Sequence, residues 1–195
     1  MDIKATLLRD KIVLNDTFFD QVAHYKAHLF KWNKVHNLTG VKTHEEADAF
    51  IYDAVFPLSF LPKVETAMDI GTGAGFPGLI LAMALPDTHF TLVEPLKKRS
   101  GFLQYIVATL GLKNVKVESC RVEELKPQRF DLVTSRAVTD TRMLLDLSEP
   151  YTSKGTLLLF YKGEKVFDEV DATVEGSLNY RVIQTQKRHY LLIEK

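Results

Sequence analysis

One stretch of the sequence determines how the rest is interpreted, and it reads Ala67-Met68-Asp69-Ile70-Gly71-Thr72-Gly73-Ala74-Gly75-Phe76-Pro77-Gly78. Its apolar beginning predicts a strand, and its glycine-rich end predicts a tight turn into a helix, because glycine tolerates the backbone angles of such turns. Pro77 suits the first turn of a helix, where a missing N–H costs nothing. At the carboxyl end of a parallel strand, such a loop forms the ligand crevice of an open α/β sheet.

Short β-rich runs alternate with helical stretches from about residue 64 onward. Strands are predicted at Thr66–Ile70, His89–Glu94, Val115–Ser119, Phe130–Ser135 and Thr156–Tyr161, and helices at Gly78–Ala84, Lys97–Leu110, Thr139–Leu147 and Val166–Leu178. This alternation is typical of right-handed βαβ units around a parallel sheet. The runs Tyr180–Gln186 and Arg188–Ile193 are almost contiguous, so we expect them to pair as an antiparallel hairpin at the sheet edge. The sequence therefore predicts an α/β fold with a mostly parallel seven-stranded sheet.

The first third of the chain is predicted to be helical. One apolar stripe recurs at steps of three and four residues and consists of Phe18, Val22, Tyr25, Leu29 and Trp32. Asn15 or Asp16 can cap the start of this helix, and a second helix follows the capping box Thr43–Glu46. We expect residues 1–62 to form a helical extension packed on a domain of residues 63–195, both within one structural unit.

Composition limits the class of protein. The chain has 195 residues, 46% of them apolar, and its 25 basic and 25 acidic side chains give zero net charge. These values predict a globular protein with its own core, and they argue against a generic polyanion-binding protein. The single cysteine, Cys120, excludes an intramolecular disulfide framework. No apolar run reaches the ~18–20 residues of a membrane span, and no signal peptide is recognisable at Met1, so we expect a cytoplasmic protein without a membrane partner.

Two kinds of ligand fit the glycine loop. Gly73-x-Gly75-x-x-Gly78 matches the dinucleotide-binding pattern, and Glu94 stands 21 residues beyond Gly73, where such proteins place the acid that binds ribose. Three features argue against a dehydrogenase. The motif extends upstream to Asp-x-Gly-x-Gly-x-Gly, which is usual for S-adenosylmethionine (SAM) sites; the chain is too short for a separate substrate domain; and SAM methyltransferase sheets end in an antiparallel pair. The sequence therefore favours SAM, with the Glu94 carboxylate accepting hydrogen bonds from both ribose hydroxyls.

Further blocks of sequence resemble one family. The stretch from Asp69 to Gly78 resembles the signature of the RsmG (GidB) family of bacterial 16S rRNA guanine-N7 methyltransferases. Trp32–Thr39 is similar to that family's N-terminal W-N-x-x-x-N-L-T block. Arg121–Glu124 and Ser135–Ala137 resemble two more blocks, which follow the third and fourth predicted strands of the sheet. The resemblance covers nearly the whole chain.

The resemblance implies a Rossmann-like class I SAM methyltransferase that acts on 16S rRNA within the 30S subunit or its precursor. Gly71 and Phe76 are expected to line the SAM site, Val122 and Glu123 to lie beside the adenine, and Arg136 to reach the cofactor or the nucleotide pocket. The expected cofactor-binding residues are Gly71, Gly73, Phe76, Glu94, Val122, Glu123 and Arg136. The chain departs from relatives at Tyr52-Asp53-Ala54, where they often have Asp-Ser, which leaves the role of this position in substrate contact open.

The residues themselves agree with methylation of a ring nitrogen. Guanine N7 carries no proton, so no general base is required, and we find no Ser-His-Asp order or Cys-His pair. The segment Thr134–Ala137 replaces the Asn/Asp-Pro-Pro-Tyr/Phe motif of exocyclic-amine methyltransferases. Cys120 follows Ser119 rather than a proline or threonine, so we expect a packing residue instead of the nucleophile of a cytosine-C5 enzyme.

Elimination alone does not select N7 of guanine. A small-molecule SAM methyltransferase and a non-catalytic RNA-binding module on the same fold remain alternatives. No catalytic side chain is expected, because aligning SAM with guanine N7 needs no general base. No metal site is expected either, because His24 and His28 lie one helical turn apart without a third ligand. The sequence does not indicate the oligomeric state.

Overall fold

The computed structural model describes residues 2–136, 138–173, 179–185 and 188–195. Its seven-stranded sheet has the order β3-β2-β1-β4-β5-β7-β6. The strands are β1 (Thr66–Ile70), β2 (His89–Val93), β3 (Val115–Glu118), β4 (Leu132–Arg136), β5 (Leu157–Lys162), β6 (Asn179–Gln184) and β7 (His189–Glu194). The pairs among β1 to β5 are parallel, and β7 pairs antiparallel with both β5 and β6. The predicted α/β fold with an antiparallel edge is confirmed.

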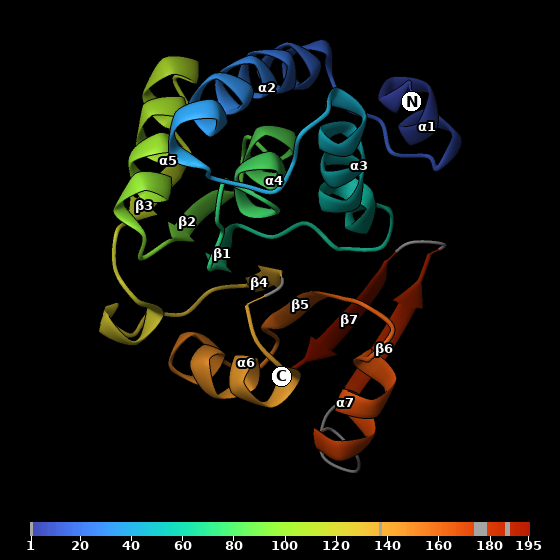
Figure 1. Ribbon diagram of the computed structural model, residues 1–195. Helices are drawn as coiled ribbons and strands as arrows, with labels where there is room; N and C mark the ends of the chain where they lie inside the picture. The colour runs from blue at the N-terminus through green and yellow to red at the C-terminus, as the bar shows by residue number, and fades with distance from the viewer. Residues whose placement is uncertain (1, 137, 174–178, 186–187) are drawn as a thin grey trace.

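Helices cover both faces of the sheet (Figure 1). They are α1 (Ile3–Arg9), α2 (Asp16–His36), α3 (His44–Val55), α4 (Gly78–Ala84), α5 (Lys97–Leu110), α6 (Thr141–Ser148) and α7 (Val166–Thr173), with short 3-10 turns η1 (Phe56–Ser59), η2 (Val122–Glu124) and η3 (Glu149–Tyr151). In Figure 1, α1 to α5 lie on one side of the sheet and α6 and α7 on the other. The N-terminal helices therefore share one face with the first two crossover helices.

The core consists of two apolar clusters, one on each face of the sheet. The larger joins α2, α4 and α5 to the sheet through residues such as Leu29, Leu81 and Phe102, all completely buried. The smaller joins α6 to the sheet and includes Leu144 and Val133. A parallel sheet covered on both faces requires strands that are apolar throughout, which explains the runs recognised in the sequence.

The carboxyl ends of the central strands meet at one edge. Ile70 at the end of β1 pairs with Val93 of β2 on one side and with Ser135 of β4 on the other. The loops that follow these three strands are therefore neighbours in space, although they are far apart in the sequence. This edge is where open α/β sheets bind ligands.

Helices α2 and α3 begin where the sequence predicts. Asn15 caps α2 by accepting a hydrogen bond from the N–H of Phe18, and Asn37 ends α2 in the left-handed conformation. Thr43 and Glu46 form the predicted capping box of α3. Caps of this kind satisfy backbone groups that a helix end otherwise leaves unpaired.

Several element boundaries differ from the prediction. Helix α1, capped by Asp2, was not predicted as a separate element. Helix α6 begins at Thr141 because Asp140 accepts a hydrogen bond from the N–H of Met143 and so caps the helix. The structure describes α7 as far as Thr173. The rest of the helix predicted at Val166–Leu178 lies outside the described residues.

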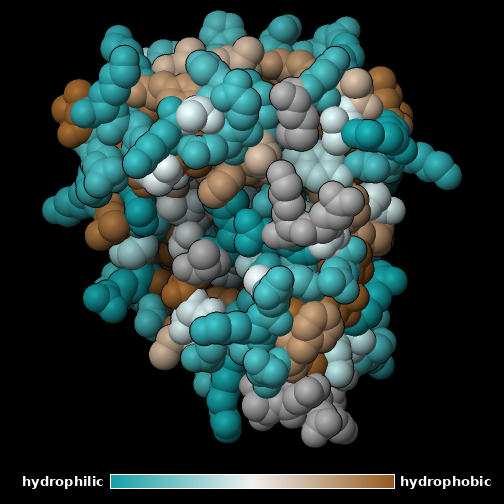
Figure 2. All heavy atoms as spheres, turned by 45° about the vertical axis from the view of Figure 1, so that its right-hand side comes forward, coloured by the Kyte–Doolittle hydropathy of each residue, from teal (hydrophilic) through white to brown (hydrophobic). Residues whose placement is uncertain are grey.

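The face shown in Figure 2 is largely hydrophilic, with apolar residues scattered among polar ones. Within the described part of the chain, none of the helices combines the length and the apolar character needed to cross a bilayer.

Candidate functional site

The loop after β1 turns sharply because its first residue has a left-handed backbone. Gly71 has a φ of +68°, a conformation that L side chains rarely adopt. The N–H groups of Gly71 and Thr72 both donate to the carbonyl of Val93, at 2.9 and 3.1 Å. The turn is thus fixed to the end of β2, directly before Glu94.

Asp69 fixes the far end of the same loop from inside the core. Its carboxylate is completely buried and accepts hydrogen bonds from the N–H of Gly78 and the hydroxyl of Thr134, both at 2.8 Å. Burial raises the pKa of Asp69 to about 6, although these hydrogen bonds act in the opposite direction. Asp69 therefore links β1, the start of α4 and β4 beneath the site. It does not line the cleft itself.

The raised pKa of Asp69 predicts how stability depends on pH. Between pH 3.8 and about 6 the folded protein holds a proton on Asp69 that the unfolded chain releases. The contribution of Asp69 to the free energy of unfolding therefore falls as the pH rises through this range. The loss amounts to about 3 kcal/mol, at about 1.4 kcal/mol per pH unit. Asp69→Asn does not titrate, so the stability of the wild type relative to this variant should fall by that amount between pH 3.5 and 7. Urea unfolding of both proteins measures it; a difference that stays constant with pH would contradict the assignment.

Glu94 uses one carboxylate oxygen to hold the glycine loop and the other to hold the segment after β2. Oε2 accepts the N–H of Gly73 and Oε1 accepts the N–H of Leu96, each at 2.9 Å. The residue is only 2% exposed. Each oxygen can accept a further hydrogen bond, so the predicted contact with ribose hydroxyls would share the carboxylate with these two amides. Glu94 therefore shapes the crevice, and its direct contact with a ligand stays a prediction.

Arg136 is held between two aromatic rings at the end of β4. Its guanidinium carbon lies 4.2 Å from the ring centroid of Phe50 and 5.1 Å from that of Phe76. Burial, together with the positive charge of Arg188, lowers the pKa of Arg136 to about 10, so it remains charged at neutral pH. Among the described residues, its Nη1 atom is buried without a hydrogen-bond partner. An Arg in this state can take an acceptor from a ligand or from water.

Phe50 is a site residue that sequence reasoning missed, because α3 comes from a remote part of the chain. Stacking between a cation and an aromatic ring contributes about 1 kcal/mol at a partly buried site. In a double-mutant cycle of Phe50→Leu with Arg136→Met, the free energies of unfolding should give a coupling of about that size. Coupling indistinguishable from zero would mean that the contact does not hold Arg136.

A cleft of about 400 Å³ lies over these residues at the carboxyl edge of the sheet. It is lined by Leu38, Thr39, Gly40, Gly71, Thr72, Gly73, Ala74, Phe76, Glu94, Pro95, Leu96, Arg99, Arg136 and Val138. Five of the seven predicted cofactor-binding residues therefore come together here. The other two, Val122 and Glu123, are not among the lining residues. Val122 is buried in the smaller apolar cluster and Glu123 is exposed, so their contact with adenine remains a prediction.

The N-terminal helices support this cleft at several points. The hydroxyl of Tyr25 donates to the carbonyl of Ala74 in the glycine loop at 2.7 Å. Asp53 accepts two hydrogen bonds from Arg188, at 3.0 and 3.1 Å, and so forms an ion pair between α3 and the residue before β7. The departure from relatives lies at the next residue, Ala54, which lacks the hydroxyl. Trp32 packs against Phe102 of α5, as expected of a core residue.

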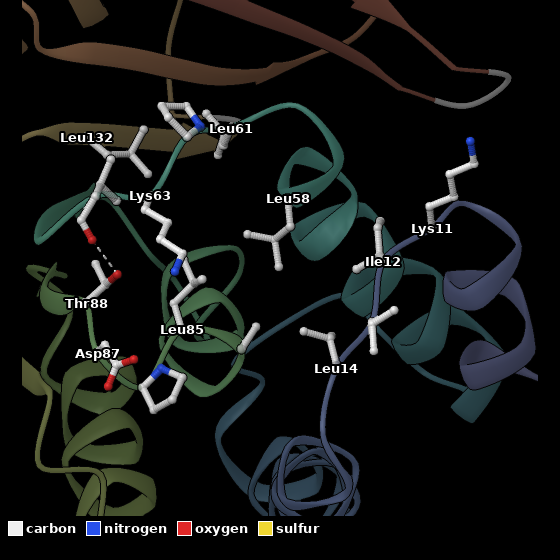
Figure 3. Close-up of a pocket in the computed structure, with 15 residues that line it drawn as sticks. Lys11, Ile12, Leu14, Leu58, Leu61, Lys63, Leu85, Asp87, Thr88 and Leu132 are labelled. Carbon is white, nitrogen blue, oxygen red and sulfur yellow. Dashed lines mark hydrogen bonds between the residues drawn. The ribbon is translucent and has the colours of Figure 1, made fainter.

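A second cavity, of about 520 Å³, lies at the opposite edge of the sheet (Figure 3). Its walls come from the segments just before β1 and β2, including Val64 and Thr88, whose hydroxyl donates to the Val64 carbonyl. Leu14, Leu58 and Leu85 are among its apolar lining residues (Figure 3). It is far from the glycine loop and from Arg136. The smaller cleft is therefore the candidate site, since it holds Arg136, a buried charged group with a perturbed pKa, beside the glycine loop.

The cleft leaves room for a ligand and offers it a buried donor. Within the described residues, Nη1 of Arg136 is buried without a hydrogen-bond partner and can bind an acceptor of a ligand. A Cβ atom at Gly71 would lie 2.5 Å from a methyl group of Val138, so only glycine leaves this corner open. The described residues contain no group of three His, Cys, Asp or Glu that could hold a metal ion.

Comparison with known proteins identifies the family. The family model GidB, described as rRNA small subunit methyltransferase G, matches residues 19–190. The chain belongs to this family. It is 47% identical over 189 residues to ribosomal RNA small subunit methyltransferase G of Wolinella succinogenes, covering 97% of this chain and 96% of the relative. It is 40% identical over 192 residues to the protein of the same name from Aliarcobacter butzleri, covering 98% of each.

Solved structures agree on the fold. A putative O-methyltransferase from Klebsiella pneumoniae superposes with a TM-score of 0.62 at 15% identity, covering 99% of this chain and 96% of that one. A mutant of MtNAS in complex with S-adenosylmethionine gives 0.60 at 15% identity, covering 91% of this chain and 77% of that one. Family and fold together confirm the predicted class of enzyme, a SAM-dependent methyltransferase, and exclude the dehydrogenase interpretation of the glycine loop.

Proposed function

We propose that this protein transfers a methyl group from SAM to N7 of a guanine in 16S rRNA of the small ribosomal subunit. The observation that carries the choice of acceptor is the match to the rRNA small subunit methyltransferase G family, and the composition of the cleft agrees with it. The titratable residues among the described lining of the cleft are Glu94, Arg99 and Arg136. The other polar side chains of the lining are threonines, which are not bases. Glu94 is committed to two backbone amides, and the arginines are cations. Among the described lining residues, Glu94 is therefore the one carboxylate, and it already accepts two amide hydrogens. Guanine N7, a lone pair without a proton, needs no general base.

SAM supplies a methyl group on a sulfonium, which is transferred in line to the attacking nitrogen. The protein contributes orientation and a fitted polar environment. We propose that Gly71, Gly73 and Glu94 hold the ribose and amino-acid parts of the cofactor, and that Phe76 and Arg136 bound the space where cofactor and base meet. Val122 and Glu123 are proposed as adenine contacts from the adjoining loop after β3.

The N-terminal residues 1–62 are proposed to act as an extension that completes the site of the domain formed by residues 63–195. Support comes from Phe50, which stacks on Arg136, and from Leu38–Gly40, which line the cleft. Lys97 and Lys98 are exposed and directly follow Leu96 of the cleft, so they are proposed to contact rRNA phosphates. The proposed substrate is rRNA in the 30S subunit or its precursor, because a protein with zero net charge suits a structured target better than free polyanion.

The test is to map the methylated atom. Small subunits and naked 16S rRNA from cells that lack the enzyme are incubated with SAM and the purified protein, and N7-methylguanine is located by borohydride reduction and aniline cleavage. We expect one new cleavage site, with transfer to the subunit or its precursor exceeding transfer to naked rRNA. Methylation of an exocyclic amine or a ribose, or incorporation only into small metabolites, would refute the proposal and favour the small-molecule alternative. RNA binding without SAM binding would favour the non-catalytic one.

A further inference from the structure

The loop Leu38–Val41 contributes one wall of the cleft, and the side chain of Asn33 makes three hydrogen bonds to its backbone. Asn33, half-buried on α2, donates from Nδ2 to the carbonyls of Thr39 and Val41, at 3.0 and 3.1 Å. Its Oδ1 accepts the N–H of Thr39 at 2.9 Å. Both amide hydrogens are thus used within the loop. The Asn33 side chain has no contact in the cleft itself, where Leu38, Thr39 and Gly40 are the lining residues of this wall.

The loop is also held from the second side. Nε of Arg99, on α5, donates to the carbonyl of Leu38 at 3.0 Å. The Leu38 side chain is buried, at 1% exposure, while Gly40 is exposed. The loop therefore leaves α2 at the left-handed Asn37, is fixed at Leu38 and Thr39, and presents its exposed part at the cleft. Such fixing by side-chain hydrogen bonds gives a loop one defined conformation.

The position of this wall in the cleft indicates which part of the bound substrates it contacts. The glycine turn at Gly71 and the Glu94 carboxylate form the floor at the strand ends, and the loop belongs to a different part of the chain, the N-terminal extension. The loop has no hydrogen bond with the glycine turn among the described residues. On the proposed function, the floor takes the cofactor and the acceptor base must enter from a side that remains exposed, which is where Gly40 lies.

We propose that Asn33 is a positioning residue for methyl transfer, because its amide holds the loop Leu38–Val41 as the wall against which the acceptor guanine is placed. The inference rests on the proposed function and adds a residue that touches neither cofactor nor base. Loss of the two amide donors would leave two carbonyls without partners and let the wall move. A displacement of about 1 Å at such a wall can lower the rate of transfer by about a hundredfold.

The chain offers a matched control. Asn114 plays the same structural part at the opposite edge of the sheet, where its Nδ2 donates to the carbonyls of Ala82, Leu85 and Thr88 at 3.0 to 3.2 Å. Asn33→Asp and Asn114→Asp each remove the amide donors and add a charge that repels backbone carbonyls. Both should reduce stability, but only one of them lies by the cleft. Asn114 therefore separates the loss of a loop's shape near the site from general destabilisation.

The experiment measures three quantities for each variant well below its unfolding temperature: SAM affinity by calorimetry, and kcat and KM for the small subunit at saturating SAM. For Asn33→Asp we expect kcat/KM to fall at least ~30-fold, with SAM affinity changed by less than about threefold. Asn114→Asp should change both by less than about threefold after correction for the folded fraction. Equal losses in the two variants, or a loss of SAM affinity as large as the loss of kcat/KM in Asn33→Asp, would overturn the proposal.

A second variant keeps the inference testable if Asn33→Asp does not fold. A side chain at Gly40 meets nothing within 4 Å, and the backbone there is not left-handed, so Gly40→Val preserves the loop while adding bulk at its exposed part. KM for the small subunit should rise about tenfold with SAM affinity unchanged, and an unchanged KM would contradict the proposed wall. If the wild type transfers no methyl group to rRNA at all, the proposed function fails first, and this inference falls with it.

Discussion

Gly78→Ala is expected to lower the free energy of unfolding by about 3 kcal/mol. A Cβ atom at Gly78 would lie 2.5 and 2.6 Å from Cβ and Oδ2 of Asp69, and 2.6 Å from Cδ2 of Leu92. All three residues are buried, so little can move away. The change would also disturb the hydrogen bond from the Gly78 N–H to Asp69, which fixes the start of α4. Urea unfolding monitored by circular dichroism measures the loss.

Gly101→Ala is the matched control for this prediction. Gly101 lies within α5, and a Cβ atom there meets nothing within 4 Å. Alanine should raise the free energy of unfolding by about 0.5–1 kcal/mol, because it restricts the unfolded chain and favours the helix. The two substitutions should thus change the free energy of unfolding in opposite directions. Similar effects of both would show that Gly78 is not packed as closely as described.

The second large effect is expected on cofactor binding. Gly71→Val should lower SAM affinity at least ~100-fold, which corresponds to about 3 kcal/mol. The valine would have to adopt the left-handed backbone conformation of Gly71, which costs about 1–2 kcal/mol in an L residue. Its Cβ would also lie 2.5 Å from Cγ2 of Val138 at the corner of the cleft. Isothermal titration with SAM or S-adenosylhomocysteine measures the change.

Gly111→Val separates these two causes. Gly111 has a φ of +63° and ends α5, and a Cβ atom there has open space around it. Valine at this position therefore brings the backbone penalty without filling the cleft. We expect reduced stability and an unchanged SAM affinity. If Gly71→Val binds SAM as the wild type does, the cofactor does not occupy this corner.

The sequence predicts the central elements well because they are specified locally. The bounds of β1, α4 and α5 agree with the prediction to the residue, since an apolar strand, a glycine turn and the left-handed Gly111 mark their ends. The predicted bounds were less accurate for elements without such signals. Strand β4 begins at Leu132 rather than Phe130, because the N–H of Phe130 bonds to Tyr151 instead of a neighbouring strand.

The candidate site was predicted where a motif carries it and missed where tertiary contacts build it. The glycine loop and Glu94 follow from spacing alone. The stacking of Phe50 on Arg136 and the hold of Asn33 on the cleft wall depend on how the N-terminal helices pack against the sheet. Periodicity places these residues on helices but does not say which strand end they meet. Lys97, Lys98 and Arg99 looked equivalent in sequence, yet Arg99 alone bonds to the carbonyl of Leu38.

Crystals of the protein with S-adenosylhomocysteine test the central claim most directly. The account predicts that the ligand lies in the cleft between the turn at Gly71 and the Glu94–Leu96 segment, with a polar group of the ligand within hydrogen-bond distance of Nη1 of Arg136. Density for the ligand in the cavity at the opposite edge of the sheet, or a cleft that binds NADH instead, would contradict it.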